Sequence, residues 1–126
     1  MDFKFGRHFE PNTDVFIDDE HARVVVRVEV AGADAENLRV AVDERFLIIT
    51  GRRIDCNFFT HGSFLQKEIE YGEFVKRIHL PVAIEIDTVT AIYGAGILSI
   101  ELPIAATEYV PAQRTELRMI VKRTLA

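Results

Sequence analysis

Residues 89–103, which read V-T-A-I-Y-G-A-G-I-L-S-I-E-L-P, constrain the fold more than any other stretch of the chain. In the second half three aliphatic residues alternate with other side chains, and a period of two places them on one face of a strand. Gly94 and Gly96 bracket the reversal, where glycine adopts a positive φ at little cost. We therefore expect an antiparallel hairpin that ends at Pro103, which has no N–H to donate.

The same period of two recurs along most of the chain. Residues 23–30, R-V-V-V-R-V-E-V, place four valines on one face and charged residues on the other, as in an antiparallel sheet with one solvated side. Asp34 is suited to cap a short helical turn. Further strands are expected at residues 14–17, 38–42, 46–50, 64–70 and 74–80, with Gly51 ending the third of these. The sequence thus predicts an all-β, immunoglobulin-like antiparallel β-sandwich of about seven to nine strands.

Length and charge narrow the class of protein. The 126 residues, 48% of them hydrophobic, suffice for one domain with one core. A formal net charge of −5, with no basic patch interleaved with aromatic residues, argues against nucleic acid as a partner. No apolar run approaches the roughly 20 residues that span a bilayer, and the start of the chain has no secretory h-region. With Cys56 as the only cysteine, these features favour a cytoplasmic protein with no internal disulfide and no membrane partner.

The residue types that carry catalysis are scattered. His8, His21, His61 and His79 lack metal-ligand spacing, and no helix follows the G-A-G turn to hold a phosphate. Cys56 and His61 share a loop with no evident oxyanion donor, and a structural role for this thiol is favoured by about twenty to one. We expect no catalytic, cofactor-binding or metal-ligating residues, and no enzyme activity.

One protein family shows these patterns in the same order. Ala91, followed after four residues by Gly96, Ile97 and Leu98, resembles the A-x-x-x-x-G-[VI]-L signature of the α-crystallin domain of small heat-shock (Hsp20) proteins. The segments V-E-V-A-G, L-R-V-A-V and F-L-I-I-T-G-R-R follow the order of that domain. Residues 64–81 are similar to the family run that ends in Y-G-x-F-x-R-x-F-x-L-P.

The resemblance covers roughly residues 12–104, between a short N-terminal arm at residues 1–11 and a C-terminal extension at residues 105–126. It implies an ATP-independent holdase that forms homo-oligomers built from dimers, binds unfolded client proteins and prevents their aggregation. Two alternatives stay open. One is a monomeric CS-type co-chaperone module, which lacks a long loop and a terminal motif; the other is a structural or assembly protein that binds no clients.

The connection after residue 53 implies a dimer contact. Residues 54–63 exceed the about two to five residues of a simple hairpin loop. In bacterial and plant-type relatives the matching loop carries an extra strand that swaps onto a partner subunit, and the alternative is a loop folded back on its own domain. Lys67 stands where the family usually has an arginine and lacks the planar fork for bidentate pairing. The residues expected at this contact are Ile54, Asn57, Phe58, Phe59 and Lys67.

The end of the chain implies a second contact. Small heat-shock proteins end with an I-x-I motif that docks as an added strand in a groove of a neighbouring subunit. The nearest match here joins Met119 to Val121, with Leu117 and Met119 as a second register. Methionine fills a pocket less strictly than isoleucine does. The alternative is an extra strand or short helix packed on its own domain.

Client contacts are expected on adaptable apolar surface. Phe3, Phe5 and Phe9 provide aromatic side chains in the N-terminal arm. Since this arm is shorter than is usual in the family, we expect a smaller oligomer and weak activity per subunit. The other candidate is a groove between the strands at residues 38–42 and 74–80, lined by Leu38, Val40, Val42, Phe74, Ile78 and Leu80.

Overall fold

The computed structural model describes residues 9–43, 45–55, 59–106, 115–117 and 120–121. Within these residues the chain forms nine β-strands and two short 3-10 helices. The strands are β1 (Thr13–Asp18), β2 (Arg23–Glu29), β3 (Arg39–Val42), β4 (Phe46–Arg53), β5 (Gly72–His79), β6 (Thr90–Gly94), β7 (Ile97–Pro103), β8 (Thr115–Glu116) and β9 (Ile120–Val121). The helices are η1 (Ala35–Asn37), which Asp34 caps as expected by accepting from the Glu36 amide, and η2 (Ile86–Thr88).

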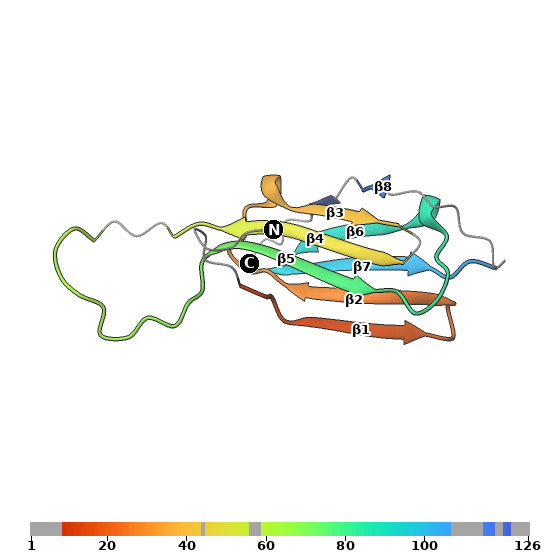
Figure 1. Cartoon of the computed structure of the whole chain (residues 1–126), viewed down its shortest axis with the longest axis horizontal. Coiled ribbons are helices and arrows are strands. Elements are labelled where there is room, and N and C mark those ends of the chain that lie inside the picture. The colour runs from red at the N-terminus through yellow and green to blue at the C-terminus, as the bar shows by residue number, and fades with distance from the viewer. Residues whose placement is uncertain (1–8, 44, 56–58, 107–114, 118–119, 122–126) are drawn as a thin grey trace.

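The strands form two sheets that lie face to face, and Figure 1 shows the four-stranded sheet in front. The five-stranded sheet has the order β1-β2-β7-β6-β9, and the four-stranded sheet has the order β5-β4-β3-β8. All the strand pairs are antiparallel except β6 with β9, which run parallel. This arrangement confirms the predicted antiparallel β-sandwich.

The core lies between the two sheets and follows from the alternation in the sequence. In β2 and β7 every second side chain is buried, because the strand's inner face meets the other sheet while its outer face meets water. Among the described residues the buried set contains no polar or charged side chain. The largest fully buried side chains are Phe74, Leu47, Ile49, Ile84, Leu98, Ile100 and Leu102.

The hairpin of β6 and β7 turns at Ala95 and Gly96, whose φ values are +53° and +78°. Gly94 is the last residue of β6 and does not carry the positive φ that the G-A-G pattern suggested. Gly96 is needed for space as well as for its φ, because a Cβ there would lie 3.0 Å from the Cβ of Ala31. Its carbonyl accepts from the Val30 amide at 2.8 Å, so the turn is tied to the end of β2.

One predicted strand boundary and one predicted strand are wrong. β4 does not end at Gly51 but continues to Arg53, because Gly51 pairs with Phe74 and the ladder extends to Gly72. A Cβ at position 51 would lie 2.6 Å from the Phe74 ring, so this glycine allows close packing rather than ending the strand. The strand expected at residues 64–70 is absent, since these residues have no ladder partner within the described chain.

Candidate assembly interface

The connection between β4 and β5, residues 54–71, leaves the sandwich and returns to it; we call it the projecting loop. It extends far to one side of the molecule (Figure 1), and its described residues form no strand. Leu65 is fully exposed and Phe59 is 82% exposed, and Ile54, Phe64 and Ile69 are also open to solvent. Clustered exposed apolar side chains of this kind mark an interaction surface.

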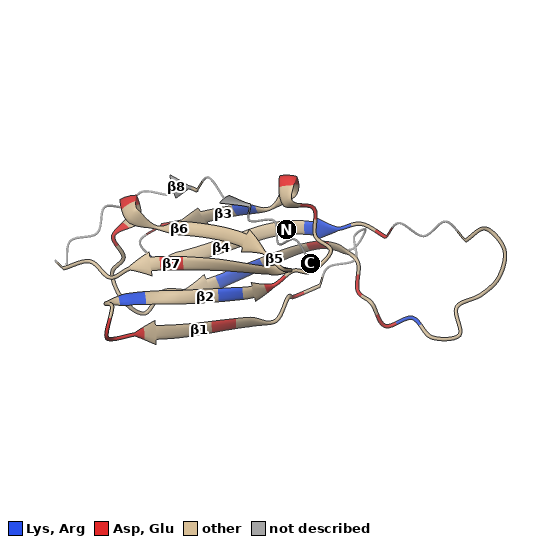
Figure 2. Cartoon of the chain, turned by 180° about the vertical axis from the view of Figure 1, so that it is seen from behind, with Lys and Arg blue, Asp and Glu red and all other residues tan. Residues whose placement is uncertain are grey.

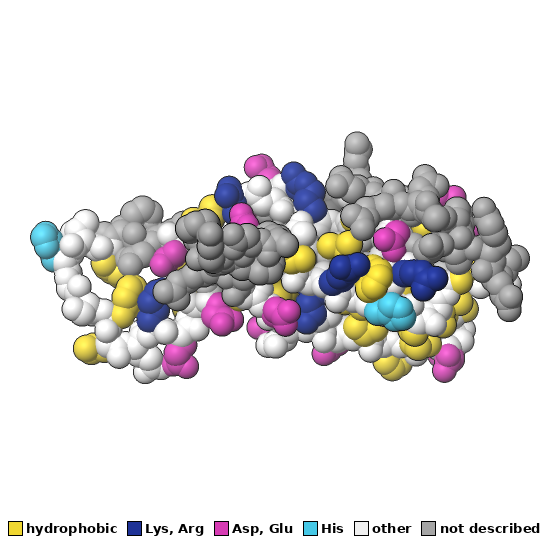
Figure 3. Space-filling view, viewed as in Figure 1, with side chains coloured by type: hydrophobic (Ala, Val, Ile, Leu, Met, Phe, Trp, Pro, Cys, Tyr) yellow, Lys and Arg dark blue, Asp and Glu magenta, His cyan; other side chains and the backbone are white. Residues whose placement is uncertain are grey.

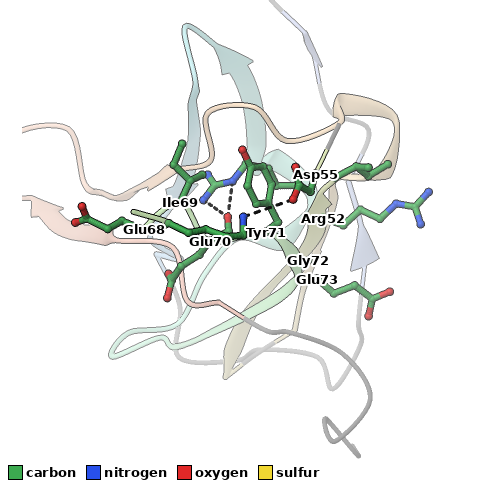
Figure 4. A pocket seen from close by; sticks show the side chains of 11 residues that line it. Arg52, Asp55, Glu68, Ile69, Glu70, Tyr71, Gly72 and Glu73 are labelled. Carbon is green, nitrogen blue, oxygen red and sulfur yellow. Dashed lines mark hydrogen bonds and ion pairs between the residues drawn. The ribbon is translucent and has the colours of Figure 1, made fainter. Parts of the chain in front are cut away.

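Arg53 holds the root of the projecting loop. Its Nε and Nη2 atoms donate to the carbonyl of Glu70 at 2.8 and 2.6 Å, as Figure 4 shows, and its Nη1 donates to the carbonyl of Ala31 at 2.9 Å. Gly32 leaves room for this side chain, since a Cβ there would approach the Arg53 Cδ to 3.2 Å. One guanidinium thus joins the end of β4, the returning part of the loop and the turn after β2.

Phe9 packs beside this root. Its ring centroid lies 5.3 Å from that of Phe74 and 4.5 Å from the Arg53 guanidinium carbon, and its amide donates to the Glu73 carbonyl at 3.2 Å. The side chain is only 6% exposed. The expectation of a free client-binding ring at this position is therefore wrong, because Phe9 belongs to the core. Phe3 and Phe5 lie outside the described residues.

Lys67 lies in the returning part of the projecting loop. Its Nζ is 3.5 Å from Asp55 Oδ2, 4.8 Å from the Phe64 ring centroid and 4.9 Å from that of Tyr71. It borders a hollow of about 830 Å³ between the two ends of the loop (Figure 4). The ion pair joins the outgoing and returning parts of the loop, and a contact of Lys67 with a partner subunit stays a prediction. Asn57 and Phe58 lie outside the described residues.

β1 is the outer strand of the five-stranded sheet on the side from which the projecting loop leaves. Among the described residues it pairs only with β2, so within them its other edge presents unpaired N–H and C=O groups. Val15, Phe16 and Ile17 are 47%, 64% and 42% exposed, which places apolar surface on both faces of this strand. A free edge with apolar side chains is suited to accept another strand.

A cluster of charges lies at the end of β1. Arg23 donates from Nε to Asp18 Oδ2 at 2.9 Å and also pairs with Glu101, while His21 Nδ1 lies 2.9 Å from the same Asp18 oxygen. The hydrogen bond from Arg23 lowers the pKa of Asp18 below its usual 3.8, and that same bond raises the pKa of Arg23. Figure 2 shows the basic residues of β2 lying between acidic residues of the neighbouring strands β1 and β7.

The described residues 115–117 and 120–121 of the C-terminal extension add to the opposite side of the sandwich. β8 adds to the outer edge of β3, and β9 adds in parallel to the outer edge of β6, with Val121 opposite Tyr93. Leu117, between them, donates its amide to the Val40 carbonyl at 3.0 Å and packs against the core. The extension therefore pairs with its own domain, which is the alternative that the sequence left open. Met119 lies outside the described residues.

The groove predicted between residues 38–42 and 74–80 is wrong as a site. β4 lies between β3 and β5, so the two strands do not border a common groove. The side chains assigned to it form part of the core instead: Leu38, Val40, Val42, Phe74, Ile78 and Leu80. Ala91 and Leu98 of the signature hairpin are buried as well, and Ile97 is half-buried at the start of β7.

Two kinds of site have no counterpart in the described part of the chain. No three His, Cys, Asp or Glu side chains there are close enough together to hold a metal ion. No helix there is long and apolar enough to cross a membrane.

Sequence reasoning did not single out Arg53 or the apolar side chains of β1. The available signals were an arginine placed between a strand and a long connection, and three consecutive apolar residues between two aspartates. In a strand, a run of apolar residues must place side chains on both faces. Such a run indicates an exposed face that a single domain does not cover.

Comparison with known proteins agrees with the family resemblance of the sequence motifs. The model of the Hsp20/alpha crystallin family matches residues 16–116. Small heat shock protein C4 of Rickettsia felis is 29% identical over 80% of this chain, and alpha-crystallin of Mycobacterium tuberculosis is 31% identical over 75%. The matches span 64% and 62% of those two proteins, so this chain covers less than two thirds of their length.

Solved structures resemble the fold over most of the chain. Heat shock protein 16.0 from Schizosaccharomyces pombe has a TM-score of 0.69 and 26% identity, covering 87% of this chain and 99% of that one. A small heat-shock protein from Xylella fastidiosa, described as having a distinct high order structure, has a TM-score of 0.67 and 29% identity, with 83% and 95% coverage.

Proposed function

Because this chain belongs to the Hsp20/alpha crystallin family, we propose that it is an ATP-independent holdase, which binds unfolding proteins and keeps them from aggregating. The observation that carries the proposal is the amount of apolar side chain left in solvent on the projecting loop and on β1. A protein that binds the unfolded state competes with the self-association of that state by mass action. No step of this mechanism requires a nucleotide or a chemical reaction.

The proposed working unit is a dimer in which the projecting loop of one copy adds to the β1 edge of another. Both surfaces are exposed and apolar; in the described chain the loop has no ladder partner, and β1 is paired only along the edge that faces β2. Joining them pairs backbone groups on two extended segments and buries side chains such as Phe16 and Leu65 together. This pairing favours the holdase over a monomeric CS-type module, which has no use for a long exposed loop.

We further propose that the C-terminal extension exchanges between copies. The edges of β3 and β6 accept β8 and β9 of the same chain, and identical contacts are available to the extension of a neighbour. Exchange of an identical element between copies costs little, because the contacts that are lost are formed again. Leu117, Met119 and Val121 are the residues assigned to this contact.

The test is suppression of aggregation. A heat-aggregating dehydrogenase is warmed with and without the protein, in buffer free of ATP, and turbidity is followed at several molar ratios. We expect turbidity to fall in proportion to the protein added, and added ATP to change nothing. Turbidity that stays the same at a molar excess of the protein would contradict the proposal and leave the structural or assembly role.

A further inference from the structure

The outer face of the four-stranded sheet differs in charge from the rest of the molecule. Its outward side chains include Arg39 on β3, Arg52 on β4 and Arg77 on β5, with Arg45 in the turn before β4. Within the described part of the chain none of these four arginines forms an ion pair, although the protein carries a net charge of −5. Uncompensated cations on an acidic protein indicate a surface that attracts anionic groups.

Apolar side chains lie among these cations. Phe46 and Ile48 of β4 are half-buried on the outward face, with Ala41 of β3 opposite Ile48 and Val75 of β5 diagonally beside it. Figure 3 shows basic and histidine side chains gathered around hydrophobic ones over this face. The face therefore offers apolar contact and positive charge within the width of three strands.

The aromatic ring orients one of the cations. The guanidinium carbon of Arg77 lies 4.1 Å from the Phe46 ring centroid, and the His79 ring contacts the same ring edge-on at 5.4 Å. A guanidinium stacked on a ring keeps its N–H edges free for a carboxylate, which it binds in a bidentate manner. Arg77 is thus held in position before a ligand arrives, and little side-chain entropy is lost on binding.

Acidic residues also lie on or near this face, and Glu116 of β8 is opposite Ala41 in the β3–β8 ladder. Glu73 lies opposite Arg52 in the β4–β5 ladder, and Figure 4 shows both side chains directed outward. Asp43 accepts hydrogen bonds from the backbone amides of Arg45 and Phe46 at the turn. Glu44 lies outside the described residues.

The opposite face of the sandwich differs. On the five-stranded sheet Arg23 is paired with Asp18 and Glu101, and Arg27 lies opposite Asp14 in the β1–β2 ladder. Because Arg23 is already paired with two carboxylates, that face offers less attraction to an acidic ligand. Asymmetry between two faces of one sandwich gives the molecule a preferred side for acidic partners.

We infer that the outer face of the four-stranded sheet binds extended client segments in which acidic residues flank aromatic or aliphatic ones. The inference rests on the proposed holdase function and names the class of client that this face prefers. A second copy of the chain is the alternative occupant, because exposed Ile69 lies between Glu68 and Glu70 on its projecting loop, and sedimentation separates the two. The ligand's carboxylates pair with Arg45 and Arg77, while its apolar side chains cover Phe46 and Ile48.

The test is a direct binding measurement. A short fluorescein-labelled peptide with aspartates on either side of a Leu-Phe pair is titrated with the whole protein, and anisotropy is recorded. A second peptide has lysine in place of each aspartate. We expect the double variant Arg45→Gln, Arg77→Gln to bind the acidic peptide about three- to tenfold more weakly, because two exposed charge contacts are lost. Raising the ionic strength from about 0.1 M to about 1 M has a similar effect, since the Debye length falls from about 10 Å to about 3 Å.

Arg27→Gln is the control for each of the two single variants, Arg45→Gln and Arg77→Gln, since it removes one positive charge from the opposite face; we expect it to leave binding unchanged. Equal binding of the two peptides, or an equal loss in the control, overturns the inference. Smaller particles of the double variant in sedimentation without peptide also overturn it, because the face is then a contact between copies. If the protein binds the acidic peptide selectively but fails the turbidity test, the binding face is supported and the holdase function is rejected. If it suppresses turbidity but binds both peptides equally, the holdase function is supported and the binding face is rejected.

Discussion

The two long sides of the sandwich end in different ways. On one side, which we call the closed side, the outer edges of β3 and β6 receive β8 and β9 of the same chain. On the other, which we call the open side, β1 and β5 have no further strand in the described chain, and the projecting loop departs next to them. The same fold thus satisfies backbone hydrogen bonds within the chain at one side and leaves them available at the other.

This difference shows how a small sandwich directs its own assembly. A free strand edge is a hazard, because it pairs with any extended chain that it meets. While the extension stays on its own domain, the free strand edge lies on the other side, where apolar side chains of β1 and of the projecting loop are exposed. The charged cluster of Asp18, Arg23 and Glu101 at the end of β1 then restricts which strands fit beside that edge.

The largest expected effect comes from removing the projecting loop. Replacing residues 57–66 by a short Gly-Ser linker deletes the exposed Phe59, Phe64 and Leu65 but keeps the root at Arg53 and Glu70. We expect loss of the dimer, with monomers in sedimentation velocity experiments, because the open side then lacks one of its two surfaces. An unchanged dimer would place the interface elsewhere, and an unchanged melting curve would show that the sandwich itself remains folded.

Arg53→Ala tests how firmly the loop is held. The variant loses three hydrogen bonds to backbone carbonyls and a contact with the Phe9 ring. We expect the free energy of unfolding to fall by about 1–2 kcal/mol, since the side chain is only half-buried. Urea denaturation measures this change, and Arg52→Ala is the matched control. Equal stability of the two variants would mean that the root contacts contribute nothing.

On the closed side the corresponding test is Leu117→Ala. Leu117 is partly buried against the core, so we expect a loss of about 1 kcal/mol in unfolding free energy and faster amide exchange in β3. Amide exchange in β1 should stay unchanged, because the substitution loosens only the closed side. Similar protection of the two edges in the unsubstituted protein would contradict the distinction between them.

The smallest expected effect depends on pH. Since pairing lowers the pKa of Asp18 in the folded state, this carboxylate adds stability above 3.8, and the contribution is lost as the pH falls through the lower folded value. Asp18→Asn therefore lowers stability at pH 7 but changes it little in strong acid. Melting curves at both pH values provide the test, and a pH-independent difference would show that the ion pairs do not cause it.

The sequence predicts most of this fold because alternation decides which face of each strand is buried. Val24, Val26 and Val28 had to lie on one face of a strand, and they do. Strand order is not encoded in such a pattern, which is why β3 and β5 were expected to border a groove although β4 separates them. Alternation also predicted a strand at residues 64–70, but a strand needs a ladder partner, and this chain provides none among its described residues.

The candidate site was less predictable for a related reason. Its exposed loop followed from length and apolar content, whereas the clamp of Arg53 depends on Ala31 and Glu70, which are distant in sequence. Phe9 is expected in the N-terminal arm as a client contact, because untethered termini tend to be poorly ordered. Here the Phe74 ring and the Arg53 guanidinium surround it. Contacts that join such distant residues become evident only in three dimensions.

The paired ends of the projecting loop make it a natural insertion site. Arg53 and Gly72 form the last rung of the β4–β5 ladder, so any sequence between them starts and finishes within one strand spacing. Doubling the length of such a segment costs only about 0.6 kcal/mol in closure entropy. The sandwich therefore tolerates replacement of this segment over evolutionary time, and foreign epitopes grafted there will be displayed without disturbing the core.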